Sequence, residues 1–192
     1  MFKITGHGPF YAISYNSPTF ADLEFYMSEV GIPLTRLDPD EFLQGVLPEK
    51  AQYINLVSRF PLRQEISQYI DNNSLSRFSF FGSYIPKLEN ISGGVFIYPG
   101  CNIYPSAKFD NDVVVHSGCT IAHNSTVGRC CYISGHTGLA GGVTLGNYCW
   151  VGAAVSIADN MVIADHTTIN IRSLIIKDIT TENTVYSKHA RM

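Results

Sequence analysis

A six-residue repeat dominates the chain between positions 97 and 175, where every sixth residue is aliphatic or aromatic. No position departs from this phase, and the series is Ile97, Ile103, Phe109, Val115, Ile121, Val127, Ile133, Leu139, Leu145, Val151, Ile157, Ile163, Ile169 and Ile175. The residues two places before them are mostly small or β-branched. Side chains alternate between the two faces of a strand, so both sets point to the same side. The repeat predicts a β-solenoid, in which each coil pairs with the next and buries a continuous apolar column.

This pattern resembles the tandem hexapeptides of the bacterial hexapeptide-repeat acyltransferases. The resemblance implies a mainly β fold: a left-handed parallel β-helix, triangular in section, preceded by a small α/β N-terminal domain. It also implies three hexapeptides, hence about eighteen residues, in each coil. We therefore divide the chain into an α/β domain at 1–92, the β-helix at 93–180 and a C-terminal tail at 181–192.

The first ninety residues read as alternating strands and helices, which predicts a small parallel sheet. The expected helices lie at 21–31, 38–46 and 61–73, and the expected strands at 52–57 and 78–81. The segment TGHG at 5–8 is similar to the SGHG that opens the sugar-nucleotide-binding domain of one branch of the family. The following segment, PFYAISYN, does not read as the helix that would receive a phosphate, so a nucleotide-binding role stays open.

Composition excludes several classes of function. A net charge of −3 with 15% charged residues leaves no electrostatic footprint for nucleic acid. The amino terminus lacks the apolar core of a signal peptide. The stretch 130–158 has no charged residue, but its glycines and polar residues make it too polar for a membrane span. We expect a cytoplasmic protein without a membrane segment.

The cysteines and histidines do not read as a metal site. Cys101, Cys119, Cys131 and Cys149 all occupy the small inward position of the repeat, which favours buried thiols in a reducing compartment. The chain has no CxxC pair, and the histidine spacings do not match those of the β-helical zinc enzymes. We expect no metal.

The segments IAHNSTVG at 121–128 and LAGGVTLGNYCWVG at 139–152 resemble the active-site segments of the sugar N- and O-acetyltransferases of bacillosamine and sialic acid pathways. The resemblance implies transfer of an acetyl group from acetyl-CoA to an amine or hydroxyl of a sugar or nucleotide sugar, with His123 as the general base. Gly141 lies eighteen residues after His123, so Gly141 and Gly142 should stack over the histidine at about 4.8 Å. We expect an open slot for the thioester there, and a Gly141 N–H that faces the developing oxyanion.

One residue departs from the family pattern. Asn124 follows the histidine where the family usually has an acid. An amide oxygen holds the imidazole tautomer but does not neutralise the imidazolium. This leaves room for an orienting role of Asp110 or Asp112, and it favours the alternative of a non-catalytic β-helical scaffold or sugar-binding subunit.

The resemblance also predicts cofactor contacts and an oligomeric state. It implies that the cofactor contacts include Tyr132, His136, Ala153 and Lys188, besides the two glycines. Aromatic packing of Tyr132 and an exposed structural role for His136 are the alternatives. The family assembles with the cofactor between neighbouring subunits, and the uncharged outward positions between 130 and 158 favour burial against another copy. We expect a homotrimer.

Overall fold

The computed structural model describes residues 3–45, 47–48 and 50–187 and divides the chain into two compact units. One unit ends at Phe80 and the other starts at Phe81, about twelve residues before the boundary drawn from the repeat. The earlier boundary has a physical reason. Phe81 belongs to the core of the second unit, and Ile85, Leu88 and Ile91 pack against that core.

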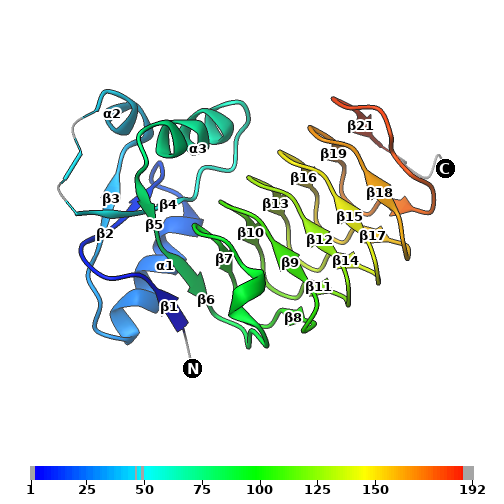
Figure 1. Cartoon of the computed structure of the whole chain (residues 1–192), viewed down its shortest axis with the longest axis horizontal. Helices are drawn as coiled ribbons and strands as arrows, with labels where there is room; N and C mark the ends of the chain where they lie inside the picture. Colours follow the sequence, from blue (N-terminus) through cyan, green and yellow to red (C-terminus); the bar gives the residue numbers. More distant parts are fainter. Residues whose placement is uncertain (1–2, 46, 49, 188–192) are drawn as a thin grey trace. The chain divides into compact units, whose positions relative to one another are not determined.

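The first unit is the expected α/β domain (Figure 1). Four of its strands form a parallel sheet in the order β3-β2-β4-β5. The three expected helices are present, whereas β1, β2, β3 and β5 were not predicted. The elements are β1 (Lys3–Thr5), β2 (Phe10–Ile13), α1 (Pro18–Glu29), β3 (Leu34–Leu37), α2 (Pro39–Leu43), β4 (Gln52–Asn55), α3 (Leu62–Asn72), β5 (Ser76–Arg77) and β6 (Ser79–Phe81).

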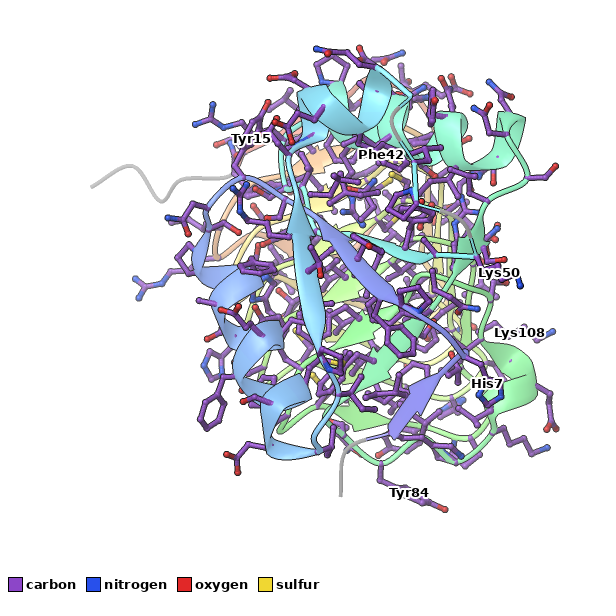
Figure 2. All side chains as sticks on the ribbon, turned by 90° about the vertical axis from the view of Figure 1, so that its left-hand side faces the viewer. His7, Tyr15, Phe42, Lys50, Tyr84 and Lys108 are labelled. Carbon is purple, nitrogen blue, oxygen red and sulfur yellow. The ribbon has the colours of Figure 1, made fainter. Side chains whose placement is uncertain are left out.

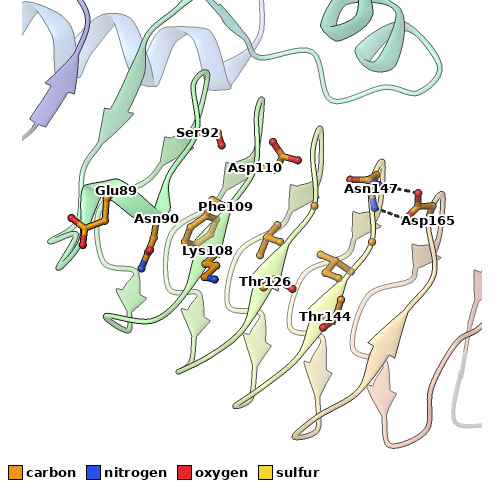
Figure 3. A pocket seen from close by; sticks show the side chains of 14 residues that line it. Glu89, Asn90, Ser92, Lys108, Phe109, Asp110, Thr126, Thr144, Asn147 and Asp165 are labelled. Carbon is orange, nitrogen blue, oxygen red and sulfur yellow. Dashed lines mark hydrogen bonds between the residues drawn. The ribbon is translucent and has the colours of Figure 1, made fainter.

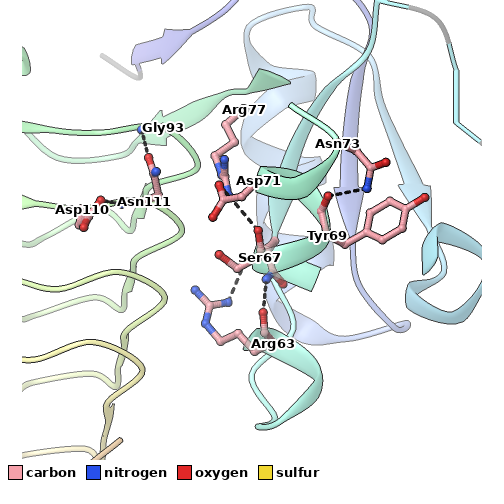
Figure 4. A network of polar contacts seen from close by, with 10 residues as sticks. Arg63, Ser67, Tyr69, Asp71, Asn73, Arg77, Gly93, Asp110 and Asn111 are labelled. Atoms are coloured by element: carbon pink, nitrogen blue, oxygen red, sulfur yellow. Dashed lines mark hydrogen bonds and ion pairs between the residues drawn. The ribbon is translucent and has the colours of Figure 1, made fainter. Parts of the chain in front are cut away.

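Capping residues set where the first two helices begin. The hydroxyl of Ser17 accepts from the N–H of Phe20 at the start of α1, and the carboxylate of Asp38 accepts from the N–H of Asp40 at the start of α2. At the far end of α3, Arg77 forms an ion pair with Asp71 at 2.8 Å (Figure 4). Interactions between residues close in the sequence therefore define the ends of these helices.

The second unit is a β-solenoid with three parallel sheets, as the repeat predicts. Each apolar residue of the six-residue series is the second residue of a two-residue strand, and none is more than 6% exposed. After the 3-10 helix η1 (Leu88–Asn90), one sheet holds β7 (Phe96–Ile97), β10 (Val114–Val115), β13 (Tyr132–Ile133), β16 (Trp150–Val151), β19 (Thr168–Ile169) and β21 (Val185–Tyr186). The next holds β8 (Asn102–Ile103), β11 (Thr120–Ile121), β14 (Gly138–Leu139), β17 (Ser156–Ile157) and β20 (Leu174–Ile175), and the third holds β9 (Lys108–Phe109), β12 (Thr126–Val127), β15 (Thr144–Leu145) and β18 (Val162–Ile163).

Strand register confirms the eighteen-residue coil. Ile121 pairs with Leu139 and with Ile103, and Val127 pairs with Leu145. The last strand, β21, pairs with β19, so the solenoid continues into the segment expected to be a tail. No helix in the described ranges has the length and apolarity needed to cross a bilayer.

The inward cysteines have a structural role in the coils. The thiol of Cys119 donates to the carbonyl of Ser134, and the hydroxyl of Ser125 donates to the carbonyl of Ala140, each fifteen residues ahead. Cys131 and Cys149 repeat the same contact with Gly146 and Ala164. A small donor at this position therefore satisfies a corner carbonyl of the next coil, which is why cysteine, serine and threonine recur there.

The corners of the coils impose a left-handed backbone conformation. The residue three places after the apolar residue has a positive φ at most corners, including Asn124 (60°), His136 (59°) and Asn160 (60°). Asparagine tolerates this conformation better than most residues. The corner geometry therefore gives a structural reason for an asparagine at position 124.

Candidate functional site

His123 lies at the corner between β11 and β12 and is exposed to solvent. The predicted stacking of Gly141 over this residue is confirmed. A Cβ added to Gly141 would lie 2.6 Å from Nε2 and 3.1 Å from Nδ1 of the imidazole. Only glycine therefore lets the ring of His123 occupy this position against the next coil.

In this structure the imidazole of His123 itself lies in the space against Gly141. The backbone amides of the two glycines also have partners. The N–H of Gly141 donates to the carboxylate of Asp159 at 2.9 Å, and the N–H of Gly142 donates to the carbonyl of His123 at 2.8 Å. The physical reason is that a corner amide of a solenoid is satisfied by the coil above or below it.

The contact between Asp159 and Gly141 belongs to a recurring type. At another corner, the side chain of Asn111 accepts from the N–H of Gly93 at 2.9 Å, one coil earlier (Figure 4). Asp165 accepts from the N–H of Asn147 in the same way at 2.8 Å. An acidic or amide side chain at a corner thus caps the coil below, and Asp159 is the residue that does so beside His123.

Asn124 lies next to the imidazole as expected, but its contact is weak. Its side-chain nitrogen is 3.5 Å from Nδ1 of His123, at the outer limit of a hydrogen bond. Its backbone N–H donates to the hydroxyl oxygen of Ser106, one coil below. The alternative orienting acids, Asp110 and Asp112, lie at a different corner, between β9 and β10. They are therefore not beside His123.

The other residues expected to contact the cofactor lie elsewhere on the chain. His136 and Ala153 occupy the corner that follows the sheet containing β13, and the ring of His136 lies over Gly118. Tyr132 is buried, and its hydroxyl is 2.6 Å from Nε2 of His116. Lys188 lies outside the described residues. One chain by itself therefore does not bring Tyr132, His136 and Ala153 to His123. The cofactor role of all four residues stays a prediction that needs a second copy.

Of the cysteines at the small inward position of the repeat, Cys119, Cys131 and Cys149 are buried, whereas Cys101 is half-buried. A hydrogen bond with the side chain of Cys101, together with burial, raises the pKa of the Cys119 thiol. Burial raises the pKa of the Cys131 thiol well above its usual value. Within the described residues, no group of three His, Cys, Asp or Glu side chains is placed to hold a metal ion.

Two adjoining hollows beside the His123 corner were not predicted from sequence. The smaller, about 330 Å³, includes Lys87, Ser106, Lys108 and Asn124 in its lining. The larger, about 610 Å³, runs along β9, β12 and β15 towards Asn147 and Asp165 (Figure 3). Lys108 lines both hollows, and no sequence motif marks it.

The segment TGHG lies at the wrong end of the sheet for a phosphate loop. It precedes β2, and Figure 2 shows His7 and Tyr15 at opposite ends of that strand. The helix that follows β2 begins at Pro18, with Ser17 as its cap. Ligands of open parallel sheets bind at the carboxyl ends of the strands, so the segment 14–17 is the better candidate for a phosphate contact.

The comparisons with known proteins concern the fold. No family model matches the chain, and no curated protein matches it in sequence. PerB from Caulobacter crescentus, solved with CoA and GDP-perosamine, has a TM-score of 0.76 at 15% identity and covers 91% of this chain and 92% of its own. The acetyltransferase domain of PglB from Neisseria gonorrhoeae has a TM-score of 0.73 at 14% identity, with 89% and 92% covered. In complex with acetyl coenzyme A, that domain has a TM-score of 0.70 at 14% identity, with 91% and 94% covered.

These likenesses define the class of fold. The chain has the fold of β-solenoid sugar N-acetyltransferases, with an α/β unit that precedes the solenoid in the sequence. At identities of 14–15% the likeness extends to the fold alone.

Proposed function

We propose that this protein is an acetyl-CoA-dependent acetyltransferase that acts on an amine or hydroxyl of a sugar or nucleotide sugar. The observation that carries the proposal is the imidazole of His123, exposed at a solenoid corner and seated on Gly141. The shared fold supports it, since PerB was solved with CoA and a nucleotide sugar.

In the proposed reaction, bound acetyl-CoA supplies the thioester whose carbonyl carbon is attacked. His123 accepts the proton from the attacking amine or hydroxyl at Nε2, and it returns a proton to the departing thiolate. Asn124 is positioned to orient the ring. A half-turn of its side-chain amide places the oxygen towards Nδ1–H and leaves Nε2 free to act as the base.

The proposed oxyanion donor is the N–H of Gly141. It becomes available when the Asp159 carboxylate turns outward, which its exposed position permits. The absence of a side chain on Gly141 keeps this N–H and Nε2 of His123 close together, because a Cβ there would lie 2.6 Å from Nε2. We place the acetyl group at this corner.

We further propose a homotrimer that works in the cytoplasm. In such a trimer, Tyr132, His136, Ala153 and Lys188 of one copy would approach a neighbour's His123. The outward residues of the central strands, including Gly138, are uncharged and would tolerate burial. Buried free thiols suit a reducing compartment.

The α/β unit would hold the nucleotide part of a nucleotide-sugar acceptor. In its strand order β3-β2-β4-β5, the direction of winding reverses beside β2, and the carboxyl ends of β2 and β4 lie together. This is where open parallel sheets bind nucleotides. The start of α1, after Ser17, offers backbone N–H groups to a phosphate there.

A second candidate function is a non-catalytic scaffold or sugar-binding subunit. Two observations favour it: Asn124 replaces an acid, and Asp159 occupies the amide of Gly141. Release of coenzyme A thiol from acetyl-CoA, measured with a panel of amino sugars and nucleotide sugars, separates the two. The enzyme releases thiol with at least one acceptor, and the scaffold with none.

Thermal stabilisation by coenzyme A is the companion measurement, because a ligand that binds only the folded state raises the melting temperature. A rise together with thiol release supports the enzyme. No thiol release and no rise in melting temperature would contradict it.

A further inference from the structure

The smaller hollow beside His123 has a distinct charge. Its lining includes Lys87, Asn90, Ser106, Lys108, Asn124 and Thr126, hence two ammonium groups and no carboxylate. In the part of the chain that the structure describes, neither lysine lies within 4.0 Å of a carboxylate. Two lysines that form no ion pair with a described carboxylate therefore line the hollow.

One hydroxyl of the hollow can also donate. The oxygen of Ser106 already accepts from the N–H of Asn124, which leaves its hydroxyl proton for another acceptor. The amide of Asn90 donates to the carbonyl of Pro105, which fixes one wall against the coil. An anionic group fits such a set of donors, whereas a cation does not.

The position of the hollow relates it to the proposed base. Asn124 is one of its walls and adjoins His123, and Lys108 is the register partner of Thr126, three residues beyond His123 (Figure 3). Lys108 thus lies one coil, about 4.8 Å, below the strand that follows the base. The hollow therefore adjoins the corner that carries His123, on the side of the preceding coil.

The adjoining larger hollow differs in charge. Glu89, Asp110 and Asp165 contribute carboxylates to its lining. These acids repel an anion along β12 and β15, so the anion is held on the side where Lys87 and Lys108 meet.

We infer that the acceptor sugar carries an anionic group, a phosphate or a carboxylate, that binds Lys87 and Lys108 in the hollow beside His123. The inference rests on the proposed acetyl transfer, since it concerns the acceptor of that reaction. The two lysines then act in acceptor selection: they attract the charged sugar and place its amine or hydroxyl near the imidazole, without contact with the reacting bond.

The test measures binding of three sugars by calorimetry: glucosamine, glucosamine 1-phosphate and neuraminic acid. They carry no anionic group, a phosphate and a carboxylate respectively, and none has a nucleoside to engage the α/β unit. The proteins are the wild type, Lys108→Gln, the double variant Lys87→Gln/Lys108→Gln, and the control Lys177→Gln. Lys177 is exposed at the same corner position as His123, three coils further on.

We expect the wild-type protein to bind at least one anionic sugar more tightly than glucosamine. Lys108→Gln should weaken that binding about tenfold and the double variant further, as expected for loss of charge-assisted hydrogen bonds at a partly exposed site. Lys177→Gln should change nothing, and coenzyme A affinity should stay the same in every variant. Whether the phosphate or the carboxylate is preferred identifies the group.

Equal affinity for all three sugars in the wild-type protein would overturn the inference. So would unchanged binding of the anionic sugar in the lysine variants, or an equal loss for glucosamine, which would indicate a structural role. Failure of the proposed function is read separately, as wild-type protein that neither binds coenzyme A nor releases thiol.

Discussion

The imidazole of His123 lies against the backbone of Gly141, eighteen residues further along the chain and one coil higher in the solenoid. A single methyl group on Gly141 would come within 2.6 Å of Nε2. The proposed base and the proposed acetyl site are therefore one structural unit, and most of the tests below act on it.

Replacing His123 with alanine should lower turnover about 100-fold or more and leave coenzyme A affinity nearly unchanged. Proton transfer contributes in the transition state, whereas cofactor binding does not depend on it. Steady-state thiol release and calorimetry measure the two effects. His166→Ala is the control, since this histidine lies at a different corner, between β18 and β19. Near-normal transfer by His123→Ala would move the search for the base to His136.

Replacing Gly141 with valine should reduce both turnover and coenzyme A affinity, because the new side chain displaces the imidazole and fills the close approach. Gly138→Ala, three residues earlier in the same coil, is the matched control, since its Cβ would meet nothing within 4 Å. Circular dichroism confirms that both variants fold. Full activity in Gly141→Val would exclude this corner as the acetyl site.

Replacing Asn124 with aspartate should raise turnover, because a carboxylate beside Nδ1 stabilises the imidazolium that forms in the reaction. The gain should be several-fold, since the pair is exposed. Asn183→Asp makes the same change in the same left-handed conformation, near the end of the described chain, and should have no effect. Lower activity in Asn124→Asp would show that the amide is the better partner of His123.

Replacing Asp159 with alanine should free the N–H of Gly141 and raise turnover about 3- to 10-fold, since the carboxylate no longer competes with the oxyanion. Asp165→Ala removes the same kind of cap at another corner and should leave turnover unchanged. Both variants should lose about 1 kcal/mol of unfolding free energy or less, measured by urea denaturation. A fall in turnover confined to Asp159→Ala would assign the carboxylate a part in the reaction.

The thiols of Cys119 and Cys131 should resist alkylation in the folded protein. Their pKa values are raised, Cys119 first by its hydrogen bond with Cys101 and Cys131 first by burial, so the reactive thiolate is absent below and around the usual thiol pKa. Mass spectrometry after iodoacetamide treatment at about pH 8 should find label on them only after unfolding. Rapid labelling of the native protein would contradict the packing described here.

Much of the solenoid followed from the sequence alone, because its rule is local. An apolar residue every six positions assigns each side chain to the inside or the outside, and stacking at eighteen residues then predicts that Gly141 meets His123. The same phase explains the inward cysteines. The early strands β2 and β3 were missed, since four-residue strands in a parallel sheet carry little periodicity of their own.

The tertiary structure decided which atoms occupy the site. Asp159 reaches the N–H of Gly141 because two corners stack, and nothing in the local sequence distinguishes that carboxylate from a solvated one. Lys87 and Lys108 are twenty-one residues apart in the sequence, and the fold of the first coil places both in the lining of one hollow. The six-residue period determined the coil and its register. The charge and the hydrogen bonds around His123 were determined by contacts between coils, because these depend on the reach of each side chain as well as on the spacing.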